Sequence, residues 1–81
     1  MRRRHTYSTK ELAKVFNVHE RTIRKWFESN KLLGYKSFFG NSWKINRRDL
    51  LYFINGKYPY NSDKREQILI NLLEIDEEKL W

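Results

Sequence analysis

The sequence predicts one small domain that is mainly α-helical, with a single β-hairpin and an extra helix at its C-terminal end. Three observations predict this fold class. Two short stretches with helical apolar spacing follow one another within residues 7–27, an aromatic-rich segment with a central turn sequence lies within residues 35–45, and a longer amphipathic stretch lies within residues 62–81. At 81 residues the chain has room for one hydrophobic core.

The first helix is expected to begin at Ser8. The Ser8 hydroxyl and the Glu11 carboxylate stand at the S-x-x-E spacing of a capping box, in which each side chain bonds a backbone amide of the other residue. Asn17 is expected to end the helix, because Asn readily adopts the left-handed conformation found at helix ends. Between these residues, the apolar side chains at helical spacing are Leu12, Val15 and Phe16.

A second short helix is expected almost at once, with Val18 in the core and His19 at the N-cap. Helices joined by so short a turn cross steeply, which leaves the start of the second one exposed. This is the geometry of a helix-turn-helix, whose second helix fits the DNA major groove. The buried stripe is expected to be Ile23, Trp26 and Phe27. The opposite face carries Glu20, Arg21, Arg24 and Lys25, although such a face can also be simply solvated.

Positive charge is concentrated in the N-terminal part of the chain. The formal net charge is +7; residues 1–50 hold 13 Lys and Arg against 4 Asp and Glu, whereas residues 51–81 hold 4 against 6. A basic surface predicts a polyanionic partner, because neutralising phosphates releases condensed counterions. An anionic membrane would call for a long basic amphipathic helix with an exposed apolar face, and none is predicted. RNA fits the charge, but a basic helix with a hairpin matches duplex DNA better.

The sequence has few features of an enzyme or of a protein that binds a metal or a cofactor. The chain has no Cys, and His5 and His19 are isolated, so no metal-ligand set is expected. It has no Gly-rich phosphate loop and no nucleophile with a paired base. No apolar run approaches the roughly 18 residues that span a bilayer, and the basic start leads into a polar helix cap instead of an apolar signal segment. We therefore expect a cytoplasmic, nucleoid-associated protein without catalytic activity.

Residues 1–6, MRRRHT, are expected to form a flexible basic arm, because nothing apolar ties them down. Arg2, Arg3 and Arg4 could lie along phosphates or enter a minor groove. The alternative is a solubilising tail without a target.

A β-hairpin is expected at residues 35–39 and 43–45, with residues 40–42 as the turn, preceded by buried Leu32 and Leu33. Such a hairpin packs on helices because two strands alone are marginally stable. It corresponds to the wing of a winged helix, or it only covers the core. The donors expected on its outer side and at its tip, suited to phosphate or minor-groove contact, are Lys36, Lys44, Asn41 and Ser42.

A third helix is expected after Asn46, the predicted N-cap, with Asp49 at the third helical position and Gly56 as its C-terminal stop. Arg47 and Arg48 fall in its first turn, where a cation opposes the helix dipole by about 0.3–1 kcal/mol. This cost points to a reason outside the fold, and a nearby phosphate would supply one.

The linker predicted at residues 57–61 contains the only Pro, and Ser62 is expected to cap the last helix. Residues 62–81 are acidic overall. The apolar face of this helix packs on the core of the domain, or it forms an oligomer or partner surface. Its members are Ile68, Leu69, Leu72 and Leu73.

Residues 7–54 resemble the excisionase-type helix-turn-helix family, a branch of the MerR-like winged-helix superfamily. Downstream, GNSWKINRRDLLYFI is similar to the family's hairpin and basic capped helix. Asn17, His19 and Glu20 depart from the family pattern, in which Gly and Ser or Thr are usual at the first two positions. The matching residues in the first half are Tyr7, Ser8, Glu11, Ala13, Val18, Thr22, Ile23, Trp26 and Phe27.

The resemblance implies sequence-selective binding of double-stranded DNA by a small protein, often from a phage, plasmid or integrative element, that directs excision or controls transcription. It also implies contacts to bases or phosphates from the second helix and the wing, and self-association on DNA is compatible with it. The alternative is an interaction module that binds an integrase, replication or host protein through the last helix. The residues expected to contact DNA are Arg21, Thr22, Arg24, Lys25, His19, Glu20, Lys36, Asn41, Ser42, Lys44, Arg47, Arg48, Arg2, Arg3 and Arg4.

Overall fold

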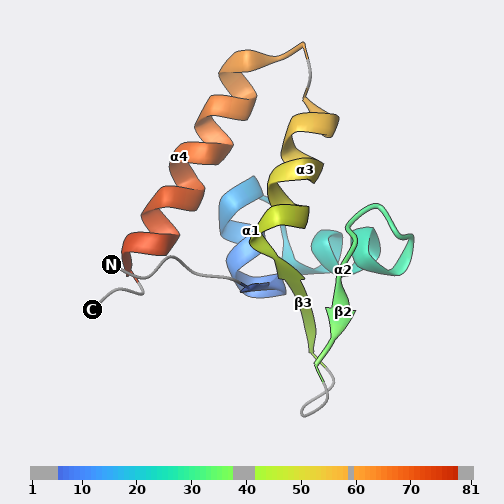
Figure 1. Cartoon of the computed structure of the whole chain (residues 1–81). Coiled ribbons are helices and arrows are strands. Elements are labelled where there is room, and N and C mark those ends of the chain that lie inside the picture. The colour runs from blue at the N-terminus through green and yellow to red at the C-terminus, as the bar shows by residue number, and fades with distance from the viewer. Residues whose placement is uncertain (1–5, 38–41, 59, 79–81) are drawn as a thin grey trace.

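The computed structural model describes residues 6–37, 42–58 and 60–78. Within them the chain forms four helices and a three-stranded antiparallel sheet (Figure 1). The predicted fold class is confirmed: a winged helix-turn-helix carries an additional C-terminal helix. In chain order the elements are β1 (Thr6–Ser8), α1 (Thr9–Phe16), α2 (Glu20–Glu28), β2 (Tyr35–Lys36), β3 (Trp43–Asn46), α3 (Arg47–Lys57) and α4 (Ser62–Glu78).

Helix α1 has both of its predicted ends. The Ser8 hydroxyl accepts from the Glu11 amide at 3.3 Å, and the Ser8 amide donates to the Glu11 carboxylate at 3.1 Å, which completes the capping box. Asn17 ends the helix in the left-handed conformation, with φ 55° and ψ 50°. The reversal at Asn17 turns the chain sharply, and the next helix starts after only three residues.

Helix α2 begins after His19, as predicted, although the His19 side chain makes no capping hydrogen bond. The His19 carbonyl instead accepts from the amides of Thr22 and Ile23. At its other end α2 stops at Glu28, and Asn30 follows with φ 62°. Asn residues thus supply the left-handed turn after both helices, since their short polar side chain tolerates this conformation.

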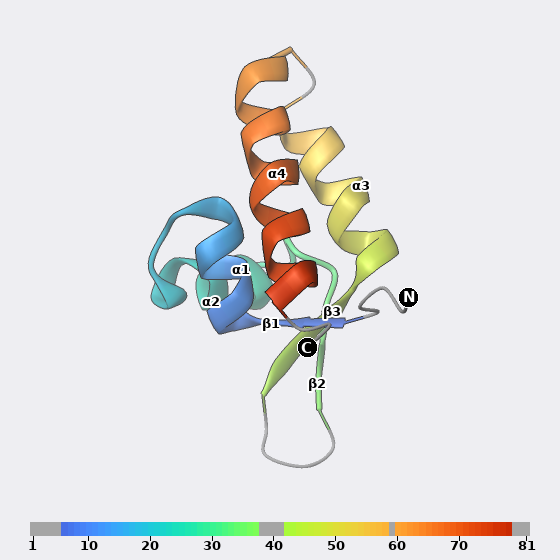
Figure 2. The same cartoon turned by 90° about the vertical axis from the view of Figure 1, so that its left-hand side faces the viewer.

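The predicted hairpin is present, and it is the outer part of a sheet with the order β1-β3-β2. Tyr35 lies opposite Lys44, and both views show β2 and β3 projecting away from the helices (Figures 1 and 2). Residues 38 and 39 of the predicted first strand and residues 40 and 41 of the predicted turn lie outside the described residues. Strand β1 was not predicted. Thr6 belongs to it, so the expected arm is wrong at that residue, and the Tyr7 side chain beside it is fully buried.

Two helix boundaries differ from the prediction, the C-terminal end of α3 and the N-cap of α4. Helix α3 begins after Asn46 with Asp49 at its third position, but the Asn46 side chain makes no capping bond. Gly56 does not stop it, since the helix continues through Lys57. At the start of α4 the cap is Asn61 instead of Ser62, because the Asn61 carboxamide oxygen accepts from the Lys64 amide at 3.2 Å.

Helix α4 closes the core by packing on α1 and α3 (Figure 2). Ile68, Leu72 and Ile75 belong to the main hydrophobic cluster and are 4%, 1% and 5% exposed. The prediction that Ile68 and Leu72 form a partner surface is therefore wrong, and the alternative that the stripe packs on the core of its own chain holds for them. The other buried members of the cluster are Tyr7, Leu12, Val15, Phe16, Ile23, Phe27, Leu32, Ile45, Leu50 and Ile54.

Candidate nucleic-acid interface

Helix α2 divides into a buried face and a charged exposed face. Ile23 and Phe27 are 0% and 1% exposed and point into the core. Because the helix repeats every 3.6 residues, the side of α2 opposite these two residues faces outward. The exposed side chains on that side are Glu20, Arg21, Arg24 and Lys25. In Figure 1, α4 lies to the left of α3 and α2 to its right, so the C-terminal helix is on the other side of α3 from α2.

A shallow hollow of about 490 Å³ lies at the N-terminal end of α2. Thr22, which lines it, is half-buried. The charged groups at its edge make no hydrogen bond or ion pair with another described residue. Three cations on this face, Arg21, Arg24 and Lys25, are therefore available to an anionic partner. The lining residues are His19, Glu20, Arg21, Thr22 and Arg24, all of which the sequence predicts as DNA contacts.

An aromatic cluster fixes the orientation of α2 on the rest of the domain. The ring of Trp26 lies 5.4 Å from that of Phe16 in α1 and 5.6 Å from that of Phe53 in α3. Phe16 and Phe53 also meet edge to face at 5.6 Å. The Lys57 ammonium lies 4.8 Å from the Trp26 ring, a cation–π distance. Because these rings pack α1, α2 and α3 together, the orientation of the exposed face of α2 is fixed relative to the other two helices.

The wing is attached directly to α2. Phe27 stacks on Trp43 of β3 with the ring planes 2° apart and the centroids 5.0 Å apart. Gly34 packs against the Phe27 ring. A Cβ at Gly34 would stand 2.2 Å from Phe27 Cε1 and 2.5 Å from the Lys44 carbonyl oxygen. Only glycine fits this approach without a shift of the chain. The position of the wing is therefore tied to the position of α2.

The two lysines of the wing lie on opposite faces of the hairpin, so the prediction that both lie on its outer side is wrong. Lys44 is paired with Tyr35, whereas Lys36 is paired with Trp43, and cross-strand partners share a face. The Lys36 ammonium lies 5.3 Å from the Trp43 ring, on the face that stacks on α2. Ser42 is exposed near the tip, and Asn41 lies outside the described residues.

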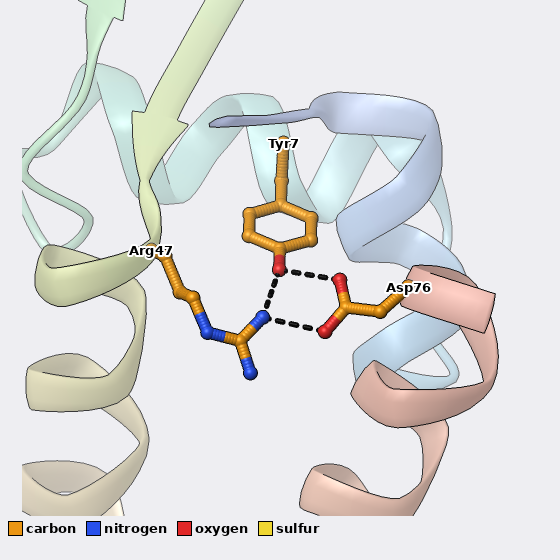
Figure 3. Close-up of polar contacts among 3 residues, drawn as sticks. All are labelled: Tyr7, Arg47 and Asp76. Carbon is orange, nitrogen blue, oxygen red and sulfur yellow. Dashed lines mark hydrogen bonds and ion pairs between the residues drawn. The ribbon is translucent and has the colours of Figure 1, made fainter. Parts of the chain in front are cut away.

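Arg47 has an internal partner, which contradicts its predicted role as a phosphate contact. Its guanidinium donates at 2.5 Å to both the Asp76 carboxylate of α4 and the Tyr7 hydroxyl of β1, and the Tyr7 hydroxyl donates to Asp76 at 2.6 Å (Figure 3). The Arg47 side chain is only 18% exposed. The cost of a cation in the first turn of α3 therefore has a reason inside the fold. Arg48 beside it remains exposed.

Burial and hydrogen bonding shift two pKa values in this cluster. Burial, followed by the hydrogen bond to Asp76, raises the pKa of Tyr7 to about 12. Burial alone would lower the pKa of Arg47, but its contacts with Asp76 and Tyr7 outweigh burial and raise it. Sequence analysis missed Tyr7 and Asp76 as members of the cluster. The one signal of the cluster in the sequence was the position of Arg47 in the first turn of α3, where a cation is unfavourable to the helix dipole and an anion nearby would offset the cost.

Of the other residues predicted to contact DNA, Arg2, Arg3 and Arg4 lie outside the described residues. On α4, Leu69 is half-buried, and Leu73 is 55% exposed beside Ile70 at 43%. Leu33 was predicted to be buried but is 62% exposed, and it lines an apolar groove of about 410 Å³ with Tyr52 of α3.

The described residues contain neither a metal-binding cluster nor a membrane-spanning helix. No group of three or more His, Asp or Glu side chains there is arranged to hold a metal ion. None of the described helices combines the length and the apolar character required to cross a bilayer.

Comparison with known proteins identifies the domain but no individual relative. Searches of curated proteins and of solved structures give no match. A family model described as a helix-turn-helix domain matches residues 6–58, which covers β1, α1, α2, the wing and α3. The match includes well over half of the 81 residues. The family is of the excisionase type and points to DNA binding. On this evidence the chain belongs to the excisionase-type helix-turn-helix family.

Proposed function

We propose that this chain is a sequence-selective double-stranded DNA-binding protein in which α2 enters the major groove. The observation that carries the proposal is the exposed face of α2. Arg21 and Arg24 line the hollow at the helix start, Lys25 follows in the last turn, and the three have no partner among the described residues. An α-helix fits the major groove, and Arg and Lys there donate to guanine O6 and N7 or to phosphates.

The wing supports the same arrangement. Lys44 and Ser42 stand on or near a hairpin that projects from the helices and is stacked on α2 through Trp43. We place these donors, together with Arg48, on the DNA backbone beside the groove that α2 occupies. Arg47 is left out of the interface because Asp76 and Tyr7 hold its guanidinium.

Selection of binding sites from a random duplex library tests the proposal. The wild-type chain should enrich a defined motif, and Arg24→Gln with Lys25→Gln should lose it. Lys64→Gln is the control, since Lys64 is an exposed cation on α4 away from the proposed interface. Failure of the wild-type chain to enrich any motif would contradict sequence-selective binding and leave only charge attraction.

For the biological role, we propose an accessory factor that acts in the cytoplasm on the DNA of a mobile element. An excisionase-like architectural factor would bind neighbouring sites in several copies and bend the duplex, a deformation that costs about 1–6 kcal/mol and is offset by contacts. A transcriptional regulator would need only to occupy an operator. Direct repeats in the selected motif would support the first role, and a single palindrome at a promoter would support the second.

One observation favours a second candidate function, a contact with a protein such as a recombinase through α4. Ile70 and Leu73 are three residues apart on the helix, so they share one exposed face, and they are 43% and 55% exposed. Ile70→Glu with Leu73→Glu should leave the domain folded. If that variant lost activity in cells while the α2 double variant kept it, α4 would be the functional surface.

A further inference from the structure

The hollow at the start of α2 is lined by a carboxylate as well as by cations, which distinguishes it from a site that binds only phosphate. Glu20 lines it together with Arg21 and Arg24. A hollow that serves only to hold phosphate has no use for a carboxylate, because two anions repel each other. A combination of acceptor and donor groups is instead complementary to a surface that offers both donors and acceptors.

The edge of a C·G base pair in the major groove is such a surface. Cytosine presents the N4 amino group as a donor, and guanine presents O6 and N7 as acceptors. A carboxylate accepts from the amino group, and guanidinium groups donate to the guanine acceptors. Glu20 and Arg24 are four residues apart and are therefore neighbours on one face of α2.

We propose that Glu20 selects a cytosine at one position of the DNA site, by accepting a hydrogen bond from its N4 amino group. This inference rests on the proposed function, because it specifies what α2 recognises. Glu20 is exposed and makes no hydrogen bond or ion pair with another described residue, so its carboxylate is available. Thymine and guanine would set O4 or the O6 and N7 acceptors against the carboxylate.

Adenine is the closest competitor, because it also carries an amino group in the major groove. Its N6 amino group stands beside N7, an acceptor, whereas cytosine has no acceptor beside N4. A carboxylate has two acceptor oxygens, so on adenine the second oxygen would face N7. A carboxamide has one acceptor and one donor, which is why Gln pairs with adenine N6 and N7. Glu20→Gln should therefore change the selected base from cytosine to adenine.

Glu20 also has a purely structural role, since an acidic residue in the first turn of a helix is favourable to the helix dipole. Loss of that role would change stability and leave the base preference as it is. Glu28 provides the matched control. It is exposed at the other end of α2, outside the hollow, and Glu28→Gln removes the same charge from the same helix.

The experiment is site selection from a random duplex library with the full chain as wild type, Glu20→Gln and Glu28→Gln, followed by competition between duplexes that differ at one position. We expect the wild-type and Glu28→Gln motifs to have a cytosine at one position where the Glu20→Gln motif has an adenine. The other positions of the motif should be the same for all three proteins. Replacing that cytosine by thymine should weaken wild-type binding roughly 5- to 150-fold. The same motif for wild type and Glu20→Gln would overturn the inference while sequence-selective binding stands. No motif for any variant would overturn both.

Discussion

The Tyr7–Arg47–Asp76 cluster joins β1, α3 and α4, and the structure predicts that Asp76→Ala destabilises the domain strongly. The substitution takes the carboxylate away from the Arg47 guanidinium, which is 18% exposed, and removes the hydrogen bond from the Tyr7 hydroxyl to Asp76. Removing one partner of a buried ion pair costs about 3–5 kcal/mol. Because the Asp76 and Arg47 side chains keep some contact with water, we expect a loss of about 3 kcal/mol, or a Tm lower by roughly 12–24 °C.

Urea unfolding followed by circular dichroism measures this loss, and Glu77→Ala is the control. Glu77 is the exposed neighbour of Asp76 in the last turns of α4, so both variants gain the helix propensity of Ala and lose one anion near the C-terminal end of a helix. Only Asp76→Ala breaks the cluster. Stabilities of the two variants within about 0.5 kcal/mol of each other would refute the reasoning.

A double variant separates the pair from its surroundings. In Arg47→Met with Asp76→Ala no charge is left without a partner, so the combined loss should be smaller than the sum of the two single losses. Additive losses would show that Arg47 and Asp76 do not interact in solution.

Three further predictions concern glycine, packing and pH. Gly34→Ala should destabilise the domain by more than about 1 kcal/mol, because the added Cβ meets an aromatic ring and a carbonyl oxygen. Gly56→Ala should stabilise it by about 0.5–1 kcal/mol, because Gly56 lies in a helix with open space around it. Denaturant midpoints that shift in the same direction for both variants would contradict this prediction. Leu72→Ala should cost about 2–5 kcal/mol and Leu73→Ala less than about 1, measured in the same way; equal costs would mean that α4 does not pack as described. Tyr7 binds its proton more tightly when folded, with a pKa of about 12, so its contribution is complete below pH 10, the ordinary tyrosine pKa, and is lost as pH rises towards 12. Between pH 9 and 12 the wild-type chain should lose about 2–3 kcal/mol more than Tyr7→Phe, which lacks this group; parallel pH profiles would contradict the assignment.

Local signals were enough to predict the helix-turn-helix. The capping box of Ser8 and Glu11 and the left-handed Asn17 depend on residues a few positions apart, and the structure reproduces them. The apolar spacing of Ile23 and Phe27 also determined which face of α2 is exposed. Signals confined to neighbouring residues are available in the sequence before any tertiary contact is known.

Features that depend on distant partners could not be predicted. Strand β1 is three residues long and exists through its pairing with β3, some 38 positions away. Arg47 was assigned to phosphate because Asp76, 29 positions further along, was not known to lie beside it. The hairpin was predicted, but its register was not, so the faces of Lys36 and Lys44 could not be assigned. A shift of one residue in register exchanges the two faces of a strand.

The same limit applies to α4. Its apolar stripe was visible in the sequence, but whether it meets the core or another protein depends on where the helix lies. The structure places Ile68 and Leu72 in the core and leaves Leu73 exposed. Sequence periodicity therefore identified the helix, and tertiary packing divided its apolar residues into two groups.

The salt dependence of DNA binding tests the central claim most directly. Fluorescence anisotropy with a labelled duplex gives the slope of log K against log salt concentration for the wild-type chain, Arg24→Gln with Lys25→Gln, and Lys64→Gln. If α2 lies against DNA, the double variant should reduce the slope by about 1–2, since each phosphate contact contributes about 0.9, and Lys64→Gln should leave it unchanged. Equal slopes for the double variant and the wild-type chain would contradict the placement of α2 on DNA.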